Sequence, residues 1–129
     1  MKIVKDVMVR EVITVSPFAK LREALSLMKR HKIKSLVVEQ QHEHDAWGLI
    51  TYTNILKTVI AEGGDIDLLN VYDVCIKPAM TVGESLAIKH VATLMAQNRI
   101  KRLLVVRDNE LLGFIAMDDM MDVLLAQVE

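Results

Sequence analysis

The sequence contains a single cysteine, Cys75, so no disulfide bond can form within the chain. It shows no charged-then-apolar leader of the secretory kind, and we therefore expect a protein of the reducing cytoplasm. Charged residues interrupt every hydrophobic stretch well short of the ~20 apolar residues that cross a bilayer. We expect no membrane contact.

Aromatic residues make up only 4% of the chain, and 16 basic residues nearly balance 17 acidic ones. The sequence therefore offers neither an aromatic surface for base stacking nor a strong positive electrostatic field that would attract nucleic acid. No basic recognition helix is evident either. A P-loop, a Ser-His-Asp order and a complete metal-ligand set are also missing, so we expect no enzyme. With 52% hydrophobic residues, the core must be built from Val, Ile, Leu and Met, which favours helices packed on sheets.

An internal repeat is the main feature of the sequence. A shift of 67 positions aligns eleven identical residues without a gap between residues 4 and 38. A shift of 65 then aligns Gly48 with Gly113 and Ile50 with Ile115. A long period repeated only twice indicates a duplicated unit of supersecondary structure and not a solenoid. The identical pairs of the first shift include Val4 with Val71, Thr14 with Thr81, Met28 with Met95, Lys34 with Lys101 and Val38 with Val105.

Each copy shows the same order of elements, βαββα. Apolar runs with β-branched residues predict strands, and apolar residues at helical spacing predict helices. The class is therefore α+β, with two pseudo-symmetric repeats whose sheets are mixed. The predicted strands are 12–15, 36–38 and 46–50 in the first copy and 79–82, 103–106 and 111–115 in the second.

Turn and cap residues mark the ends of these elements. Ser16 is placed as an N-cap and Pro17 as the first residue of the helix that follows the first strand. The closing helices are predicted over 53–62 and 118–127, and Asp-Asn lies at the centre of the second hairpin loop. We expect a first repeat over 1–62, a linker over 63–70 and a second repeat over 71–129.

These motifs together resemble the cystathionine-β-synthase (CBS) domain, which occurs in tandem as the pair called a Bateman module. The resemblance covers nearly the whole chain. It is carried by Asp-Val-Met at 6–8, Ile-Lys-Ser-Leu-Val-Val at 33–38 and Gly-Leu-Ile-Thr-x-x-Asn at 48–54, and by their counterparts at 73–74, 100–105 and 113–119.

The last motif has a physical interpretation of its own. A strand that ends in Gly-apolar-apolar-Thr and opens into a helix presents N–H groups and a hydroxyl to a phosphate. The resemblance implies that the hydroxyl meets phosphate and that the acid three residues later meets ribose. The first copy has Thr51 and Asn54, and the second has Ala116 and Asp119, so each copy keeps one of the two groups.

The resemblance implies an adenosine-type ligand, namely AMP, ADP, ATP or S-adenosylmethionine, in the cleft between the repeats, with no other cofactor required. We predict one better site and one poorer site. Segments 14–17 and 81–83 would line the base. The better site has Asp119, Arg102 and Lys101 with Thr81 and Val82, and the poorer has Thr51, Asn54 and Lys34 with Thr14, Val15 and Pro17.

Each of these residues also has a purely structural interpretation. Thr51 can be a helix N-cap, and Asp119 can be a first-turn acid favoured by the helix dipole. Arg102 with Lys101 can be solvated charges at a strand end. His42 and His44 lie in a hairpin loop without a second cluster to complete a metal shell, so we expect no metal site there.

The sequence leaves two functions open. The first is a stand-alone regulatory module, dimeric by resemblance, that binds an adenosine-type nucleotide and signals to a partner protein. The second is a scaffold or dimerisation module with degenerate clefts. This function is favoured because Asn54 stands where the motif has an acid and Ala116 stands where it has a hydroxyl residue.

Overall fold

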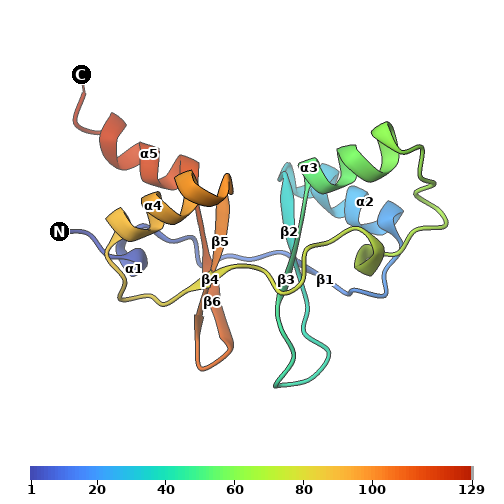
Figure 1. Ribbon diagram of the computed structural model, residues 1–129, viewed down its shortest axis with the longest axis horizontal. Helices are drawn as coiled ribbons and strands as arrows, with labels where there is room; N and C mark the ends of the chain where they lie inside the picture. Colours follow the sequence, from blue (N-terminus) through green and yellow to red (C-terminus); the bar gives the residue numbers. More distant parts are fainter. Residues whose placement is uncertain (129) are drawn as a thin grey trace. The chain divides into compact units, whose positions relative to one another are not determined.

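The computed structural model describes residues 1–128 of the chain, which form two compact units (Figure 1). Unit 1 consists of Met1–Val12 together with the chain from Met80 onward, and unit 2 is Ile13–Ala79. Each unit contains one three-stranded mixed sheet with helices, which confirms the predicted α+β class and the duplicated βαββα order.

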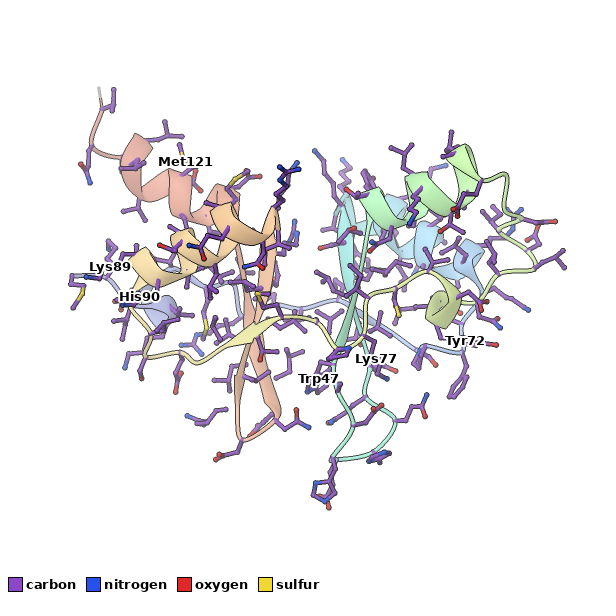
Figure 2. The ribbon with its side chains drawn as sticks, in the orientation of Figure 1. Trp47, Tyr72, Lys77, Lys89, His90 and Met121 are labelled. Atoms are coloured by element: carbon purple, nitrogen blue, oxygen red, sulfur yellow. The ribbon has the colours of Figure 1, made fainter. Side chains whose placement is uncertain are left out.

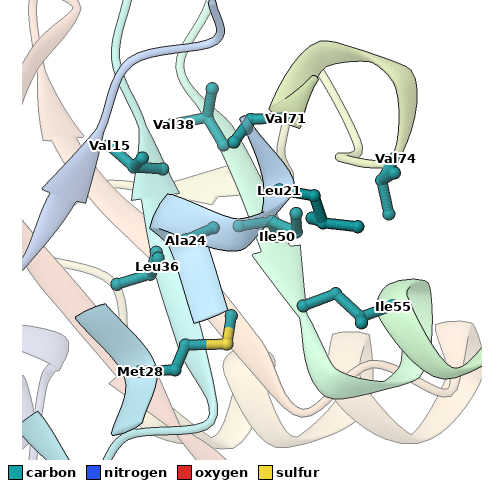
Figure 3. Packing of buried hydrophobic residues seen from close by; sticks show 10 residues of the cluster. All are labelled: Val15, Leu21, Ala24, Met28, Leu36, Val38, Ile50, Ile55, Val71 and Val74. Carbon is teal, nitrogen blue, oxygen red and sulfur yellow. The ribbon is translucent and has the colours of Figure 1, made fainter. Parts of the chain in front are cut away.

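Unit 2 is built on strands β1 (Thr14–Val15), β2 (Ser35–Val38) and β3 (Gly48–Thr51), with β1 parallel and β3 antiparallel to β2. Helix α2 (Leu21–His31) makes the crossover between the parallel strands. The closing helix begins as α3 (Tyr52–Ile55) and continues as the π-helical segment η1 (Leu56–Ala61), and the 3₁₀ turn η2 (Val71–Asp73) follows. The core of the unit is shown in Figure 3 and comprises Val15, Leu21, Ala24, Met28, Leu36, Val38, Ile50, Ile55, Val71 and Val74.

Unit 1 repeats this plan with β4 (Thr81–Val82), β5 (Arg102–Arg107) and β6 (Glu110–Ala116), joined by α4 (Ile88–Asn98) and followed by α5 (Met117–Leu125). The short helix α1 (Val4–Val7) belongs to the same unit. Asp108 and Asn109 form the turn between β5 and β6 with φ of 51° and 63°. These left-handed angles suit a tight hairpin, and Asp and Asn tolerate them, so the predicted turn is confirmed.

The compact units divide the chain differently from the sequence repeats. The segment that opens each repeat packs into the unit formed by the rest of the other repeat: Val4 is fully buried in the core of unit 1, and Val71 is fully buried in that of unit 2. We call residues 3–9 and 70–76 the exchanged arms. Residues 63–70, predicted as a linker, also pack inside unit 2, where Leu21 N donates to Leu69 O at 2.9 Å.

Each arm pairs with the outer strand of its sheet at the residue that follows a glycine. Val9 exchanges two backbone hydrogen bonds with Phe114, of 2.8 and 3.0 Å, and Ile76 exchanges two of 2.9 Å with Leu49. A Cβ atom at Gly113 would lie 2.2 Å from Val9 O, and one at Gly48 would lie 3.1 Å from Ile76 O. The close passage of the arm therefore explains why glycine recurs at this position of both copies.

The predicted start of the first long helix is wrong. Helix α2 begins at Leu21, and Ser16 Oγ instead accepts a hydrogen bond from Phe18 N, at 3.1 Å, within a turn that precedes the helix. Lys20 stays extended because it forms a β-bridge with Asn70, which holds the chain out of helical geometry until Leu21. Strands β1 and β4 are correspondingly shorter than predicted, with two residues each.

An ion pair fixes the chain just after the second arm. Lys77 Nζ lies 2.7 Å from Asp45 Oδ2 and 3.3 Å from Glu39 O, and the side chains of Lys77 and Asp45 are partly buried (Figure 2 labels Lys77). The pKa of Asp45 is lowered to about 2, mainly by the hydrogen bond from Lys77 and to a lesser extent by the one from Gln41 N. This pair ties the loop between β2 and β3 to the segment that leads into β4.

We expect Val71→Ala to lower the free energy of unfolding by about 2 kcal/mol, because it removes a fully buried apolar side chain and leaves a cavity under α2. Urea denaturation of the two proteins measures the difference. Val128→Ala is the matched control, since Val128 is 72% exposed, and we expect it to change stability by less than about 0.5 kcal/mol. Equal effects of the two substitutions would contradict the role given to the arm.

Candidate functional site

In unit 1 two of the predicted site residues, Arg102 and Thr81, lie on one face of the sheet. Alternate residues of a strand point to opposite faces, and Leu103, Val105 and Ile115 point into the helix-covered core. Arg102, paired with Ala116, therefore points to the face that the helices leave uncovered. Thr81 lies on the same face because it is paired with Leu104, two residues further along β5.

Arg102 is the most distinctive side chain of this face. Its guanidinium carbon lies 4.9 Å from the centre of the Phe114 ring, a cation–π contact that holds the half-buried side chain in place. Burial lowers the pKa of Arg102, and the charges of Asp119 and Asp118 oppose this effect. Within residues 1–128 the guanidinium has no hydrogen-bond acceptor and no ion-pair partner, so its donors remain available to a ligand.

Asp119 and Lys101 lie at the same end of the sheet as Arg102. Asp119 Oδ2 accepts a hydrogen bond of 2.9 Å from Ala116 N, and Met117 N donates to Lys101 O at 2.9 Å. The first contact caps helix α5, and the second joins the start of β5 to the start of that helix. The sequence prediction that Asp119, Arg102 and Lys101 lie together is thus consistent with this geometry, and we call these three residues the α5 corner.

Unit 2 has an equivalent corner formed by Thr51, Asn54 and Lys34. Tyr52 N donates to Lys34 O at 3.1 Å, as Met117 does in unit 1. Asn54 Oδ1 accepts from both Thr51 N and Thr51 Oγ1, each at 3.0 Å, and Asn54 N donates to Thr51 Oγ1 at 3.3 Å. The helix-cap interpretation of Thr51 is therefore confirmed, and its hydroxyl proton is already engaged.

The segments expected to line a base differ in what they expose. The side chains of Val15 and Val82 are buried in the cores of their own units, and Pro17 is buried as well, so mainly backbone atoms of these residues can reach a ligand. Thr14 Oγ1 donates to Glu39 Oε2 at 2.9 Å.

Sequence reasoning missed two side chains of these faces, Phe114 and Glu39. Phe114 comes two residues before Ala116 on the same strand, and Glu39 directly follows β2. The period of two along a strand was the signal that could have placed Phe114 beside Arg102.

Two further observations concern metal and membrane contacts. Within residues 1–128, no three His, Cys, Asp or Glu side chains are placed to share a metal ion. His42 and His44 are exposed, and His44 pairs with Glu43 at 3.3 Å. Over the same residues, no helix combines the length and apolar character needed to span a bilayer.

Comparison with known proteins places the chain in a family. The CBS domain model matches twice, over residues 4–61 and 71–126, and the chain belongs to the CBS domain family. It is a tandem CBS pair, as its motifs predicted. It is 33% identical over 120 residues to the CBS domain-containing protein YhcV of Bacillus subtilis, covering 93% of this chain and 84% of that protein.

Solved structures share the fold. A hexameric CBS-CP12 protein from bloom-forming cyanobacteria is 36% identical, with a TM-score of 0.89, over 94% of this chain and 70% of the other. The CBS domain pair of protein MJ0100, solved with 5-methylthioadenosine and S-adenosyl-L-methionine, has a TM-score of 0.84 at 23% identity and covers 98% of both chains.

We expect Thr51→Ala to destabilise the protein by about 1 kcal/mol, since it removes the side-chain cap of α3. Thr53→Ala, at an exposed position in the same helix, is the matched control and should have little effect. Thermal unfolding without ligand measures both. Equal stability of the two variants would show that the hydroxyl of Thr51 does not cap the helix.

Proposed function

We propose that this CBS pair is a non-catalytic regulatory module that binds an adenosine-type nucleotide and transmits its presence to a partner protein. The observation that carries the proposal is the Arg102 guanidinium, which is half-buried on Phe114 and has no acceptor within the described chain. A cation held in this way is preorganised to bind a phosphate group, with which arginine forms paired hydrogen bonds.

The α5 corner offers complementary groups for the two ends of a nucleotide. Arg102 and the exposed Lys101 supply positive charge for phosphate. Asp119 uses Oδ2 for the helix cap, and Oδ1 can accept hydrogen bonds from a pair of ribose hydroxyls. The corner of unit 2 is the poorer site in this proposal, because Thr51 and Asn54 bind each other and Asn54 carries no charge.

The ligand class is supported by the related CBS pair of MJ0100, whose structure holds 5-methylthioadenosine and S-adenosyl-L-methionine. AMP, ADP, ATP and S-adenosylmethionine are therefore the ligands to test first. A second function, a ligand-free scaffold, is favoured by the absence of a hydroxyl at Ala116 and by the internal capping contacts of Thr51.

We expect millimolar AMP, ADP, ATP or S-adenosylmethionine to raise the unfolding temperature, because a ligand that binds only the native state stabilises it by mass action. Arg102→Gln should abolish most of the shift for the phosphate-bearing ligands. Asp119→Asn should weaken the shift for every ligand while keeping the helix cap, since Asn54 shows that an amide oxygen accepts the same backbone hydrogen bond in unit 2.

Arg107→Gln is the control for a lost arginine, because Arg107 lies at the far end of β5 and pairs with Glu84. It should retain the full ligand shift. A panel of ligands that leaves the unfolding temperature unchanged would favour the scaffold function, and a shift that survives both Arg102→Gln and Asp119→Asn would move the site away from the α5 corner.

We also propose that the module is a homodimer formed through its exposed helices. A groove of about 440 Å³ runs between α4 and α5, and all its lining residues belong to unit 1. Its rim exposes large apolar side chains, among them Met121 at 43% and Leu124 at 55% (Figure 2 labels Met121). The lining residues are Ile88, Lys89, Ala92, Met95, Ala96, Ile100, Met117, Met120, Met121, Val123 and Leu124.

Sedimentation equilibrium should show a dimer for the parent protein and a monomer for Met121→Glu, which places a charge on the apolar rim of the groove. Glu110→Gln, at an exposed position of β6, is the control and should remain dimeric. A monomeric parent protein would exclude this mode of assembly.

A further inference from the structure

We propose that unit 2 binds a basic, aliphatic segment of the partner protein on an exposed aromatic pair, Phe18 and Tyr72. This inference rests on the proposed signalling to a partner, and it names the surface and the kind of segment that fits it. The two ring centres lie 6.2 Å apart in an edge-to-face arrangement, and the residues are 65% and 52% exposed. Figure 2 shows Tyr72 projecting away from the ribbon.

Hydrogen bonds within unit 2 hold the aromatic pair in place. Tyr72 N donates to Pro17 O at 3.0 Å, which joins the segments that carry the two rings. Asn70 Nδ2 donates to the hydroxyl oxygen of Tyr72 at 2.9 Å and orients that ring. Leu68 of the same segment is 74% exposed and adds apolar surface. The fold therefore keeps the rings in solvent, and a partner that covers them loses little affinity to the ordering of side chains.

The two segments that carry the aromatic pair are acidic. Residues 17–23 and 62–73 together contain five acidic and two basic side chains, and all five acids are exposed. One of the two bases, Arg22, is already engaged by Asp67 through two hydrogen bonds. An excess of negative charge therefore surrounds the rings. The acidic residues are Glu23, Glu62, Asp65, Asp67 and Asp73, and the basic residues are Lys20 and Arg22.

Unit 1 lacks this surface, although its backbone makes the same contacts. Lys5 takes the position of Tyr72 in the alignment of the repeats, and Ser85 takes that of Phe18. Lys5 N donates to Glu84 O at 2.9 Å, as Tyr72 N donates to its partner in unit 2. The fold thus forms here without aromatic side chains, which leaves their presence in unit 2 to be explained by binding. A basic segment is attracted to unit 2 and repelled by Lys5 of unit 1.

A basic, aliphatic segment satisfies both parts of the surface. The face of an aromatic ring attracts a Lys or Arg cation, and neighbouring carboxylates pair with the same cation. Aliphatic side chains of the segment cover the apolar area of the rings and of Leu68. The negative charge acts against an acidic partner and against a membrane of anionic lipids.

Titration followed by nuclear magnetic resonance tests the surface with a defined probe, a short peptide of alternating arginine and leucine. We expect the peptide to shift the ring signals of Phe18 and Tyr72, and Tyr72→Ser to weaken binding about tenfold. Tyr52→Ser is the matched control, because Tyr52 is a 49% exposed tyrosine of the same unit, and it should bind as the parent protein does. Equal affinity of the two variants, or no binding by the parent protein, would overturn the proposal.

The contribution of charge is measured with a second peptide and a second variant. A peptide of alternating glutamate and leucine should not bind. Asp65→Asn combined with Asp73→Asn removes two charges and keeps the oxygens that accept from Asp67 N and Asn70 N, so the fold is retained. This variant should bind the arginine peptide about threefold more weakly. Binding of the glutamate peptide as tight as that of the arginine peptide would overturn the proposal.

Two further measurements separate this proposal from nucleotide binding and from self-association. The titration is made without nucleotide, and Tyr72→Ser should keep the full thermal shift with nucleotide. A missing thermal shift in the parent protein would contradict nucleotide binding alone, and a missing peptide titration would contradict the docking surface alone. Sedimentation equilibrium should give the same assembly state for Tyr72→Ser and the parent protein. A smaller assembly of Tyr72→Ser would show that a second copy covers the aromatic pair and would overturn the proposal.

Discussion

The exchange of arms is the constraint on which the rest of the structure depends. Val4 and Val71 are fully buried, yet each completes a core whose other residues come almost entirely from the opposite repeat. Backbone pairing of Val9 with Phe114 and of Ile76 with Leu49 then fixes each arm along its sheet. Neither sequence repeat therefore contains all the side chains of its own core, and folding of one unit requires a segment of the other repeat.

Much of the fold could be predicted because its strands and helices follow simple periods. The βαββα order, the helices at 21–31 and 88–98 and the Asp-Asn turn depend on local residues, and local patterns report them. The start of α2 and the arms could not be predicted, because pairing of Lys20 with Asn70 is a contact across fifty positions. The π-helical geometry of η1 could not be predicted either, because the spacing of apolar residues there is the same as in an ordinary α-helix.

By resemblance to the CBS domain, the sequence predicted that Lys101, Arg102 and Asp119 lie together, and in the structure the three residues lie at one end of the sheet. The sequence could not indicate that Phe114 holds the guanidinium of Arg102, since that contact requires the register of two strands. Nor could it show that Thr51 and Asn54 satisfy each other, which separates a helix-capping role from a ligand-binding role at the same position.

The exchanged arms also have an evolutionary consequence. A single ancestral repeat could complete its core only by lending its arm to another molecule, so the simplest ancestor compatible with this fold is an arm-swapped dimer of identical chains. In this chain the same exchange is intramolecular, so its strength does not depend on protein concentration. Two copies within one chain need not be identical, and here one corner carries the acid Asp119 and the other the hydroxyl of Thr51.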